Sequence, residues 1–356
     1  MSPFPFMRFS FPPPTHCSLI SFLCSSNSPS MAGTLIPSSN KLVQHTEETL
    51  TQPPPNTLDF PIPLTRHPPP ISKQVELDRA MAASAKSGFS ITKSDVIYED
   101  QWLIAINKPS GVYCDHVLAS IPRLLGVSPE SSGAENPLEL HLGNRLDRDT
   151  SGVMLITKLH KVAGKLVQAF TEHRVKKTYI ALCIGLAPQW EEIALKSGHG
   201  RSKFGAWRVY SASDIGRTLP GGSVVREMVT SFKVLSVNGL SSENIDFIEK
   251  RNEMLIVRDE GSKISSTHDA KDEILIRAYP QSGRTHQIRL HCQYLGIPLR
   301  GDVKYEGPHE WKEKTYDYHA LHAENLSFDH PVTGSLMEFH APLPSWAREA
   351  LSCTKG

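Results

Sequence analysis

The chain has 356 residues, of which 39% are hydrophobic and 21% charged, and its formal net charge is +1 at pH 7. That balance excludes a protein that is basic throughout, so a nucleic-acid site would have to be a local patch. The six cysteines are scattered without a CxxC pair, which argues against a disulfide framework or a structural zinc site. No apolar run approaches the roughly 20 residues that span a bilayer, so no transmembrane helix is expected.

Residues 1–88 are predicted to be a disordered N-terminal extension. Three Pro-Pro-Pro runs interrupt them, and this composition buries too little apolar surface to offset chain entropy. The first acidic residue is Glu47, and an acid-free, Ser-rich start is typical of an organelle transit peptide. A transit peptide would place the protein in the chloroplast or mitochondrion; an uninformative tail would leave it in the cytoplasm or nucleus. A short helix over residues 75–85 is compatible with the Ala-rich composition there.

Residues 89–106 predict a strand, a turn and a second strand, the second being the apolar run Leu103–Ile106. The segment NKPSG that follows ends this strand abruptly, since Pro109 lacks a backbone donor and Gly111 permits positive φ. Lys108 is therefore placed at a strand end, facing a loop. A solvated lysine at a turn is the plainer interpretation. A short helix is expected over 118–125.

The stretch HLGNRLDRDTSGVML, residues 141–155, starts polar, turns at residues 150–152 and enters an apolar strand. Asp147 lies between Arg145 and Arg148. A carboxylate held between guanidiniums in front of a buried strand has a depressed pKa and stays ionised at neutral pH. A surface loop of solvated charges is the alternative for such a short pattern.

A helix is predicted over 159–173, where apolar residues recur on one face. From residue 145 to residue 177 the chain carries eight bases against three acids, Asp147, Asp149 and Glu172. This local basic patch suits contacts with phosphates. Its last members follow the helix: Arg174, Lys176 and Lys177.

Residues 175–184 alternate as a strand, with Tyr179 on one face near the basic turn. Half-buried packing is the common role of a strand tyrosine. The aromatic residues among bases in 189–222 suit either RNA stacking or ordinary strands, and the sequence does not decide between them. A long strand is expected over 226–237. Residues 238–272 are predicted to be a variable surface insertion, polar and irregular apart from residues 254–257.

Residues 274–279 predict a strand that leads through PQSG into a helix over 284–295. Arg284 would lie in the first turn of that helix, where the helix dipole disfavours a cation. We therefore expect Arg284 to have another partner, such as a carboxylate. The spacing of His286 and His291 does not indicate a metal site. A strand around His319–His322 and a short final helix after residue 343 complete the chain.

Five blocks in this order resemble the RluA-type family of RNA pseudouridine synthases: NKPSG, RLDRDTSG, RVKKTYIA, GRTHQIRLH and LHAENLSFDHPVTG. The resemblance covers roughly residues 90 to 346. It implies an α+β pseudouridine synthase fold, in which helices flank a long mixed, mostly antiparallel sheet with a central active-site cleft. The catalytic domain would span residues 89–348. An N-terminal S4-like domain, present in many relatives, is not recognisable in residues 1–88.

The resemblance also assigns roles. The catalytic set that it implies is Asp147, Tyr179 and Arg284, with Arg284 paired to Asp147. The residues expected to contact the substrate, from the resemblance or from the basic pattern, are Arg145, Lys108, Ile288 and Arg148. The RNA-binding candidates are Arg174, Lys176 and Lys177. One departure is Asn144, since the family usually has His before Arg-Leu-Asp.

The implied function is isomerisation of specific uridines in RNA to pseudouridine, with Asp147 as the catalytic carboxylate and Tyr179 as a base or a ring stacked on uracil. The expected partner is ribosomal, transfer or messenger RNA. No cofactor, metal or membrane is implied, and a monomer is expected. One alternative is a catalytically silent RNA-binding protein on the same fold. The other, weaker one is a metal phosphohydrolase that uses Asp147 and Asp149 as a DxD pair.

Overall fold

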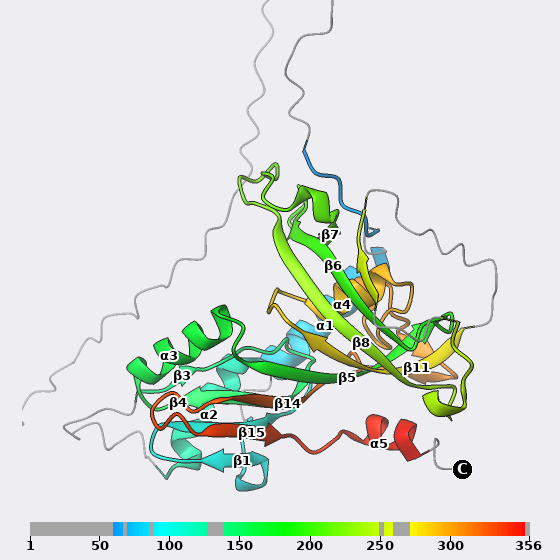
Figure 1. Cartoon of the computed structure of the whole chain (residues 1–356). Coiled ribbons are helices and arrows are strands. Elements are labelled where there is room, and N and C mark those ends of the chain that lie inside the picture. Colours follow the sequence, from blue (N-terminus) through cyan, green and yellow to red (C-terminus); the bar gives the residue numbers. More distant parts are fainter. Residues whose placement is uncertain are drawn as a thin grey trace, which may run out of the picture. The chain divides into compact units, whose positions relative to one another are not determined.

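A thirteen-stranded mixed sheet is the framework of the structure, a computed structural model in which residues 60–66, 70–85, 89–126, 139–248, 253–258 and 271–352 are described (Figure 1). The strand order along its main path is β1-β2-β4-β14-β5-β11-β8-β6-β10, with β3, β7, β9 and β15 attached beside it. Only the pairs β4–β14 and β6–β10 are parallel among the described strands. The predicted α+β fold with a long, mostly antiparallel sheet is confirmed.

The strands of this sheet are β1 Val96–Glu99, β2 Leu103–Lys108, β3 His141–Leu142, β4 Ser151–Thr157, β5 Lys176–Gly185, β6 Glu192–Arg201, β7 Trp207–Tyr210, β8 Arg226–Val237, β9 Leu240–Ser241, β10 Glu253–Ile256, β11 Asp272–Pro280, β14 Leu321–Asp329 and β15 Leu336–His340. A separate small hairpin consists of β12 Glu310–Trp311 and β13 Lys314–Thr315. The described helices are α1 Pro70–Ser84, α2 Cys114–Leu124, α3 His160–Thr171, α4 Gln287–Tyr294 and α5 Ser345–Ser352. None of the helices in the described ranges is long and apolar enough to cross a membrane.

Helices cover both faces of the sheet because its central strands are apolar on both sides. All seven residues of β4 are buried. Leu155 packs with Leu166 of α3 on one face, and Met154 packs with Ile121 of α2 on the other. A hydrophobic effect of roughly 25 cal/mol per Å² of buried apolar surface favours this two-sided burial. The apolar run of β4 therefore predicts its central position.

Strand β5 lies in the middle of the main path, between β14 and β11. Its alternation sends Ala181 and Cys183 into the cluster that contains α4, whereas Ile180 and Leu182 pack on the side of α5. Tyr179 packs against the α4 side. The predicted two-faced strand is thus observed, and it presents Tyr179 on the face that carries α4.

The folded part of the chain begins earlier than residue 89, and this corrects the predicted boundary. The expected helix over 75–85 is observed as α1, and Arg79 on it is 9% exposed. Leu64 also donates a backbone hydrogen bond to Val209 of β7. The predicted transit peptide lies outside the described residues.

The segment 238–272 is described only in part. Its described portion contains β9 and β10, and the sequence pattern predicts neither strand. Because β10 pairs in parallel with β6, this segment adds a strand at the end of the sheet path. The remaining residues of the predicted insertion, 249–252 and 259–270, lie outside the described ranges.

Candidate active site

Asp147 lies in the loop between β3 and β4. Its backbone carbonyl accepts a hydrogen bond from the amide of Thr150 at 3.2 Å, which closes the turn before β4. Gly152 has φ +111, and a Cβ atom there would lie 2.2 Å from the carbonyl oxygen of Ala323 in β14. Only glycine permits this close approach of two backbones. The predicted turn at residues 150–152 therefore sets where the Asp147 loop meets the sheet.

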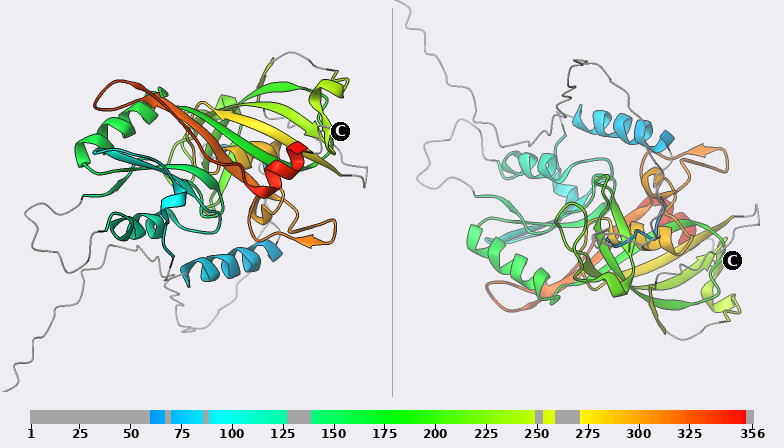
Figure 2. Two further views of the ribbon diagram at one scale, coloured as in Figure 1. Left: turned by 90° about the horizontal axis from the view of Figure 1, so that it is seen from below. Right: turned by 90° about the horizontal axis from the view of Figure 1, so that it is seen from above.

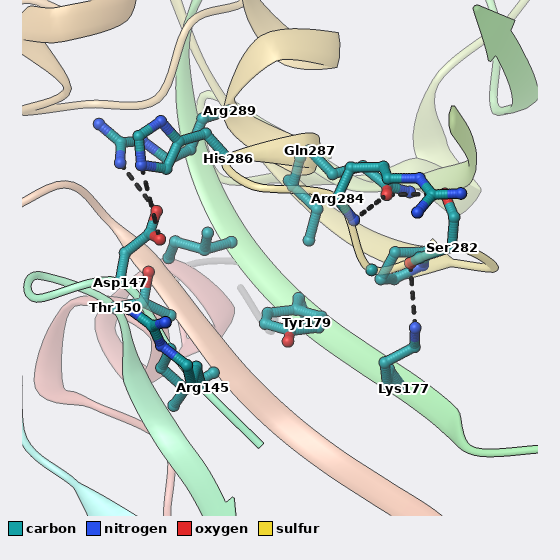
Figure 3. A pocket seen from close by; sticks show the side chains of 15 residues that line it. Arg145, Asp147, Thr150, Lys177, Tyr179, Ser282, Arg284, His286, Gln287 and Arg289 are labelled. Atoms are coloured by element: carbon teal, nitrogen blue, oxygen red, sulfur yellow. Dashed lines mark hydrogen bonds and ion pairs between the residues drawn. The ribbon is translucent and has the colours of Figure 1, made fainter. Parts of the chain in front are cut away.

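Asp147 is held by an arginine of α4. The Nη1 atom of Arg289 donates to Oδ2 of Asp147 at 2.8 Å. The same guanidinium binds Asp302 through two further hydrogen bonds, Nε to Oδ2 at 2.7 Å and Nη2 to Oδ1 at 2.8 Å. The side chains of Arg289 and Asp302 are 6% and 1% exposed. Arg289 thus bridges two carboxylates in a largely buried network, and Figure 3 shows its contact with Asp147.

The predicted pairing of Arg284 with Asp147 is wrong. The Nε atom of Arg284 donates to the carbonyl oxygen of Glu227 at 3.0 Å. Helix α4 begins at Gln287, so Arg284 lies in the preceding loop and not in the first helical turn. The argument from the helix dipole therefore does not apply to it. The motif GRTHQIRLH contains a second arginine, Arg289, and no spacing in the motif favours it over Arg284 as the partner of Asp147.

His286 turns its ring toward Asp147 from an unusual backbone conformation. It precedes α4 with φ 58 and ψ 24, the left-handed region that costs energy for a residue with a side chain. Its Nδ1 lies 2.7 Å from the hydroxyl of Tyr305, and its Nε2 lies 3.7 Å from Oδ1 of Asp147. Burial, together with the nearby charge of Arg289, lowers the pKa of His286 from its ordinary value to about 3. The imidazole is therefore neutral at pH 7.

Asp147 stays ionised although it is in a cavity. Burial alone would raise the pKa of its carboxyl, but His286, Arg289 and His319 hold that pKa well below its usual range. Because His286 is neutral at pH 7, the permanent charge that acts on Asp147 is the guanidinium of Arg289. The expectation of an ionised Asp147 is met, although the responsible arginine is a different one.

Tyr179 and Asp147 face the same cavity, of about 120 Å³ (Figure 3). Ile288 from α4, Leu321 from β14 and Arg145 from the Asp147 loop also line it. The Tyr179 side chain projects from the central strand β5. Burial, together with the charge of Asp147, raises the pKa of Tyr179 well above its usual range, so its hydroxyl is protonated at neutral pH.

A second, larger cavity of about 540 Å³ adjoins the first. Asp147, Arg145, Arg284 and His286 line both cavities. The further walls of the larger one include Glu76 of α1 and Lys304. Asp147 therefore lies at the junction of a smaller cavity and a larger, more polar one.

Lys108 does not line either cavity, which corrects its predicted place in a base pocket. It is fully buried, and its Nζ donates to the carbonyl oxygens of Pro109, Arg148 and Thr150 at 2.8–2.9 Å. Two of these carbonyls belong to the Asp147 loop. Lys108 therefore anchors that loop from behind.

Arg148, a predicted substrate contact, is engaged by carboxylates. Its Nε and Nη2 donate to Asp149 at 2.6 and 2.8 Å, and Nη2 lies 3.6 Å from Glu76. Asp149 is 3% exposed and faces Arg148, whereas Asp147 faces Arg289. This arrangement does not fit the DxD metal pair of the phosphohydrolase alternative. Within the described ranges, no group of three His, Cys, Asp or Glu side chains could hold a metal ion.

The predicted RNA-binding bases divide into two groups. Lys177 lines the smaller cavity and donates from Nζ to the carbonyl of Ser282 at 3.0 Å. Burial lowers its pKa to about 8. Arg174 and Lys176 are exposed, and Arg174 forms an ion pair with Glu172 at 2.7 Å. The structure therefore brings only Lys177 to Asp147 and Tyr179.

Asn144 does not line either cavity. Its Oδ1 accepts a hydrogen bond from the amide of Leu155 at 2.7 Å, and its Nδ2 donates to the carbonyl of Val153 at 3.4 Å. The side chain thus satisfies backbone groups of β4. The departure at this position affects the support of the Asp147 loop rather than the cavity itself.

Sequence reasoning missed Arg289, Asp302 and His286 as members of the site. Arg289 and His286 were visible within the block GRTHQIRLH, but Asp302 had no signal beyond a Gly-Asp turn. Its role depends on a contact with Arg289 thirteen residues away, which only the fold creates.

Comparison with known proteins gives consistent matches. Residues 102–294 match the family model described as RNA pseudouridylate synthase. RNA pseudouridine synthase 1 of Arabidopsis thaliana is 55% identical over 291 residues, covering 82% of this chain and 88% of the relative. RNA pseudouridine synthase 1 of Oryza sativa subsp. japonica is 56% identical over 299 residues, covering 83% and 86%. The solved structure of Human RNA Pseudouridylate Synthase Domain Containing 1 aligns with a TM-score of 0.48 at 21% identity, over 73% of this chain and 86% of that one.

Proposed function

Since this chain belongs to the RNA pseudouridylate synthase family, we propose that it isomerises specific uridines in RNA to pseudouridine, with Asp147 as the catalytic carboxylate. The observation that carries the role of Asp147 is its position: an ionised carboxylate, fixed by buried Arg289, in a cavity that Tyr179 also lines. The candidate substrates are ribosomal, transfer and messenger RNA.

The reaction needs a carboxylate at this point. The N1–C1′ glycosidic bond breaks, uracil turns, C5 bonds to C1′, C5 loses its proton and N1 gains one, so atoms balance without a co-reactant. Glycosidic cleavage develops positive charge at C1′, which an ionised carboxylate stabilises or traps. The Arg289 guanidinium keeps Asp147 ionised at neutral pH, and its tie to Asp302 fixes the direction of the carboxylate. Fixed charges aimed at the reacting atoms act strongly in a largely buried site.

The smaller cavity suits the uracil of the substrate. Ile288 and Leu321 offer apolar surfaces, and the Tyr179 ring offers a flat one. A general base works best with a pKa near the operating pH, and the pKa of Tyr179 is raised by burial. The Tyr179 hydroxyl is therefore protonated in the free enzyme, and we assign Tyr179 to stacking on uracil rather than to the role of general base.

A uridine inside folded RNA reaches this cavity only when its nucleotide is extruded. Arg145 lines both cavities and forms no ion pair with a carboxylate in the described part of the chain, so its guanidinium is available to the RNA. Lys177 is positioned at the same cavity, with exposed Arg174 and Lys176 nearby in sequence for phosphate contacts. The positions of these basic side chains support RNA as the partner.

The test is site-resolved pseudouridine mapping of ribosomal, transfer and messenger RNA from cells with and without this protein, followed by the purified protein on each candidate RNA. Wild type is expected to convert the mapped uridine, and Asp147→Asn to abolish conversion while RNA binding persists. Asp317→Asn is the control, because Asp317 is exposed and lines neither cavity. If wild type converts no uridine in any of these RNAs yet binds RNA, the silent RNA-binding protein is the correct alternative.

A further inference from the structure

We propose that helix α1 is a positioning element of the active site. Its residues Arg79 and Glu76 hold together the loop that carries Asp147 and the loop that carries Asp302, the two carboxylates that Arg289 binds. This inference rests on the proposed function. It concerns a helix that lies outside the matched family region of residues 102–294. Figure 2 shows α1, in blue, beside the orange segment that contains the 3₁₀ turn Val303–Tyr305.

Arg79 binds the loop that follows α4. Its Nη1 donates to the carbonyl of Gly301 at 2.9 Å, and its Nη2 donates to the carbonyl of Tyr316. Gly301 directly precedes Asp302, the residue that makes two hydrogen bonds to Arg289. The buried guanidinium of Arg79 therefore fixes the backbone next to Asp302, the carboxylate that orients Arg289.

Glu76 acts on the other loop. One of its carboxylate oxygens lies 3.7 Å from Nη1 of Arg79, and the other lies 3.6 Å from Nη2 of Arg148. Arg148 is adjacent to Asp147 in sequence and is itself bound to Asp149. Glu76 also lines the larger cavity beside Asp147. One turn of α1 thus contacts both loops, one through each side chain.

The two loops come from distant parts of the chain. Asp147 is 142 residues from Arg289 of α4, which in turn binds Asp302 in the other loop, so these contacts depend on how the two loops are held in space. A helix keeps Glu76 and Arg79 on one face, three residues apart, at a fixed separation. A misplacement of about 1 Å at reacting groups can lower a rate roughly 100-fold. The contacts of α1 are placed to prevent such a shift.

A purely structural role would give a different result from a positioning role. If α1 only stabilised the fold, its loss would lower the melting midpoint and leave the rate constant of the folded protein unchanged. If α1 positions the loops, kcat of the Arg79 variants falls while their affinity for RNA stays, because Arg79 lines neither cavity.

The experiment uses the full-length chain with Arg79→Met, Arg79→Lys and Glu76→Gln. The control is Asp78→Asn, a charge change on the same helix whose carboxylate hydrogen-bonds only Gln74 in the described structure. We expect Arg79→Met to lower kcat roughly 10- to 100-fold at unchanged RNA affinity, Arg79→Lys to recover part of it, and Asp78→Asn to match wild type. Glu76→Gln, at a partly exposed position, keeps the test open if Arg79→Met does not fold.

Hydrogen exchange of the loops 143–150 and 298–309 provides a measurement that is independent of activity. Faster exchange in both loops of Arg79→Met or Glu76→Gln, but not of Asp78→Asn, is the expected result. Unchanged exchange and unchanged kcat in the folded variants would overturn the positioning role. A wild-type protein that forms no pseudouridine would instead overturn the proposed function, and the exchange result would still decide the role of α1.

Discussion

Replacing Arg289 by Lys tests the electrostatic basis of the site. Arg289 donates three hydrogen bonds, two to Asp302 and one to Asp147, from one planar guanidinium. An ammonium group keeps the charge but lacks the fork geometry, so at least one contact is lost. A hydrogen bond to a charged group contributes about 1.5–3 kcal/mol. If the lost contact orients Asp147, the rate falls roughly 10- to 100-fold.

The assay is single-turnover conversion of a mapped uridine with enzyme in excess, together with thermal unfolding. A loss of ~2 kcal/mol would lower the melting midpoint by about 4–8 °C. Arg284→Lys is the matched control, because Arg284 contacts a carbonyl of Glu227 and not Asp147. With the enzyme at a saturating concentration, Arg284→Lys is expected to keep most of the rate. A large loss in Arg284→Lys together with a wild-type rate in Arg289→Lys would refute the assignment.

Three further predictions concern the support of the site. Lys108→Met leaves three carbonyls without their donor, one buried and two partly buried. The free energy of unfolding, measured by denaturant titration, should fall by at least the ~1–3 kcal/mol of one unsatisfied group. A change below ~1 kcal/mol would contradict the anchoring role. Asn144→Ala leaves the amide of Leu155 without its acceptor, so the free energy of unfolding should fall by about 1–3 kcal/mol in the same titration, and the folded enzyme should keep its turnover. Loss of turnover at unchanged stability would instead give Asn144 a role in the chemistry. Acid should destabilise the protein, because burial lowers the pKa of several histidines from 6.5 to about 3 or 4, so the unfolded chain binds more protons below pH 6.5. Stability present above pH 6.5 is then lost toward pH 4, by roughly 2 kcal/mol per histidine at pH 5, and a melting midpoint equal at pH 7 and pH 5 would exclude this. The histidines are His199, His286, His291 and His322.

Local pattern was enough to predict the central elements of the fold. The strand expected over 226–237 has the same bounds as β8, and Tyr179 lies on the strand predicted for it. Alternation and apolar runs carry this information because the order of apolar and polar residues in a strand indicates which of its faces are buried. The start of α4 was misplaced by three residues, since His286 adopts a left-handed conformation that its residue type does not predict.

The partners of charged side chains were harder to predict than the elements. Lys108 looks like a solvated turn lysine in sequence, but it is buried because three carbonyls of converging loops surround it. Arg284 and Arg289 are indistinguishable by residue type, and the loop before α4 decides which one reaches Asp147. Likewise, Arg79 lies in a stretch of weak amphipathic pattern, and its burial depends on the loop around Gly301.

The position of β14 in the sheet has a consequence for the folding of the chain. Strand β14 lies near the C-terminal end of the described residues. In the sheet it lies between β4 and β5, two strands that follow each other in the sequence with only helix α3 between them. The strand after the Asp147 loop and the strand that carries Tyr179 therefore reach their final spacing only when β14 has inserted between them. Pairings across such long sequence separations form slowly because loop-closure entropy opposes them. During synthesis, a chain that has not yet released residues 321–329 has all its cavity residues except Leu321 but cannot hold Asp147 and Tyr179 at their working distance.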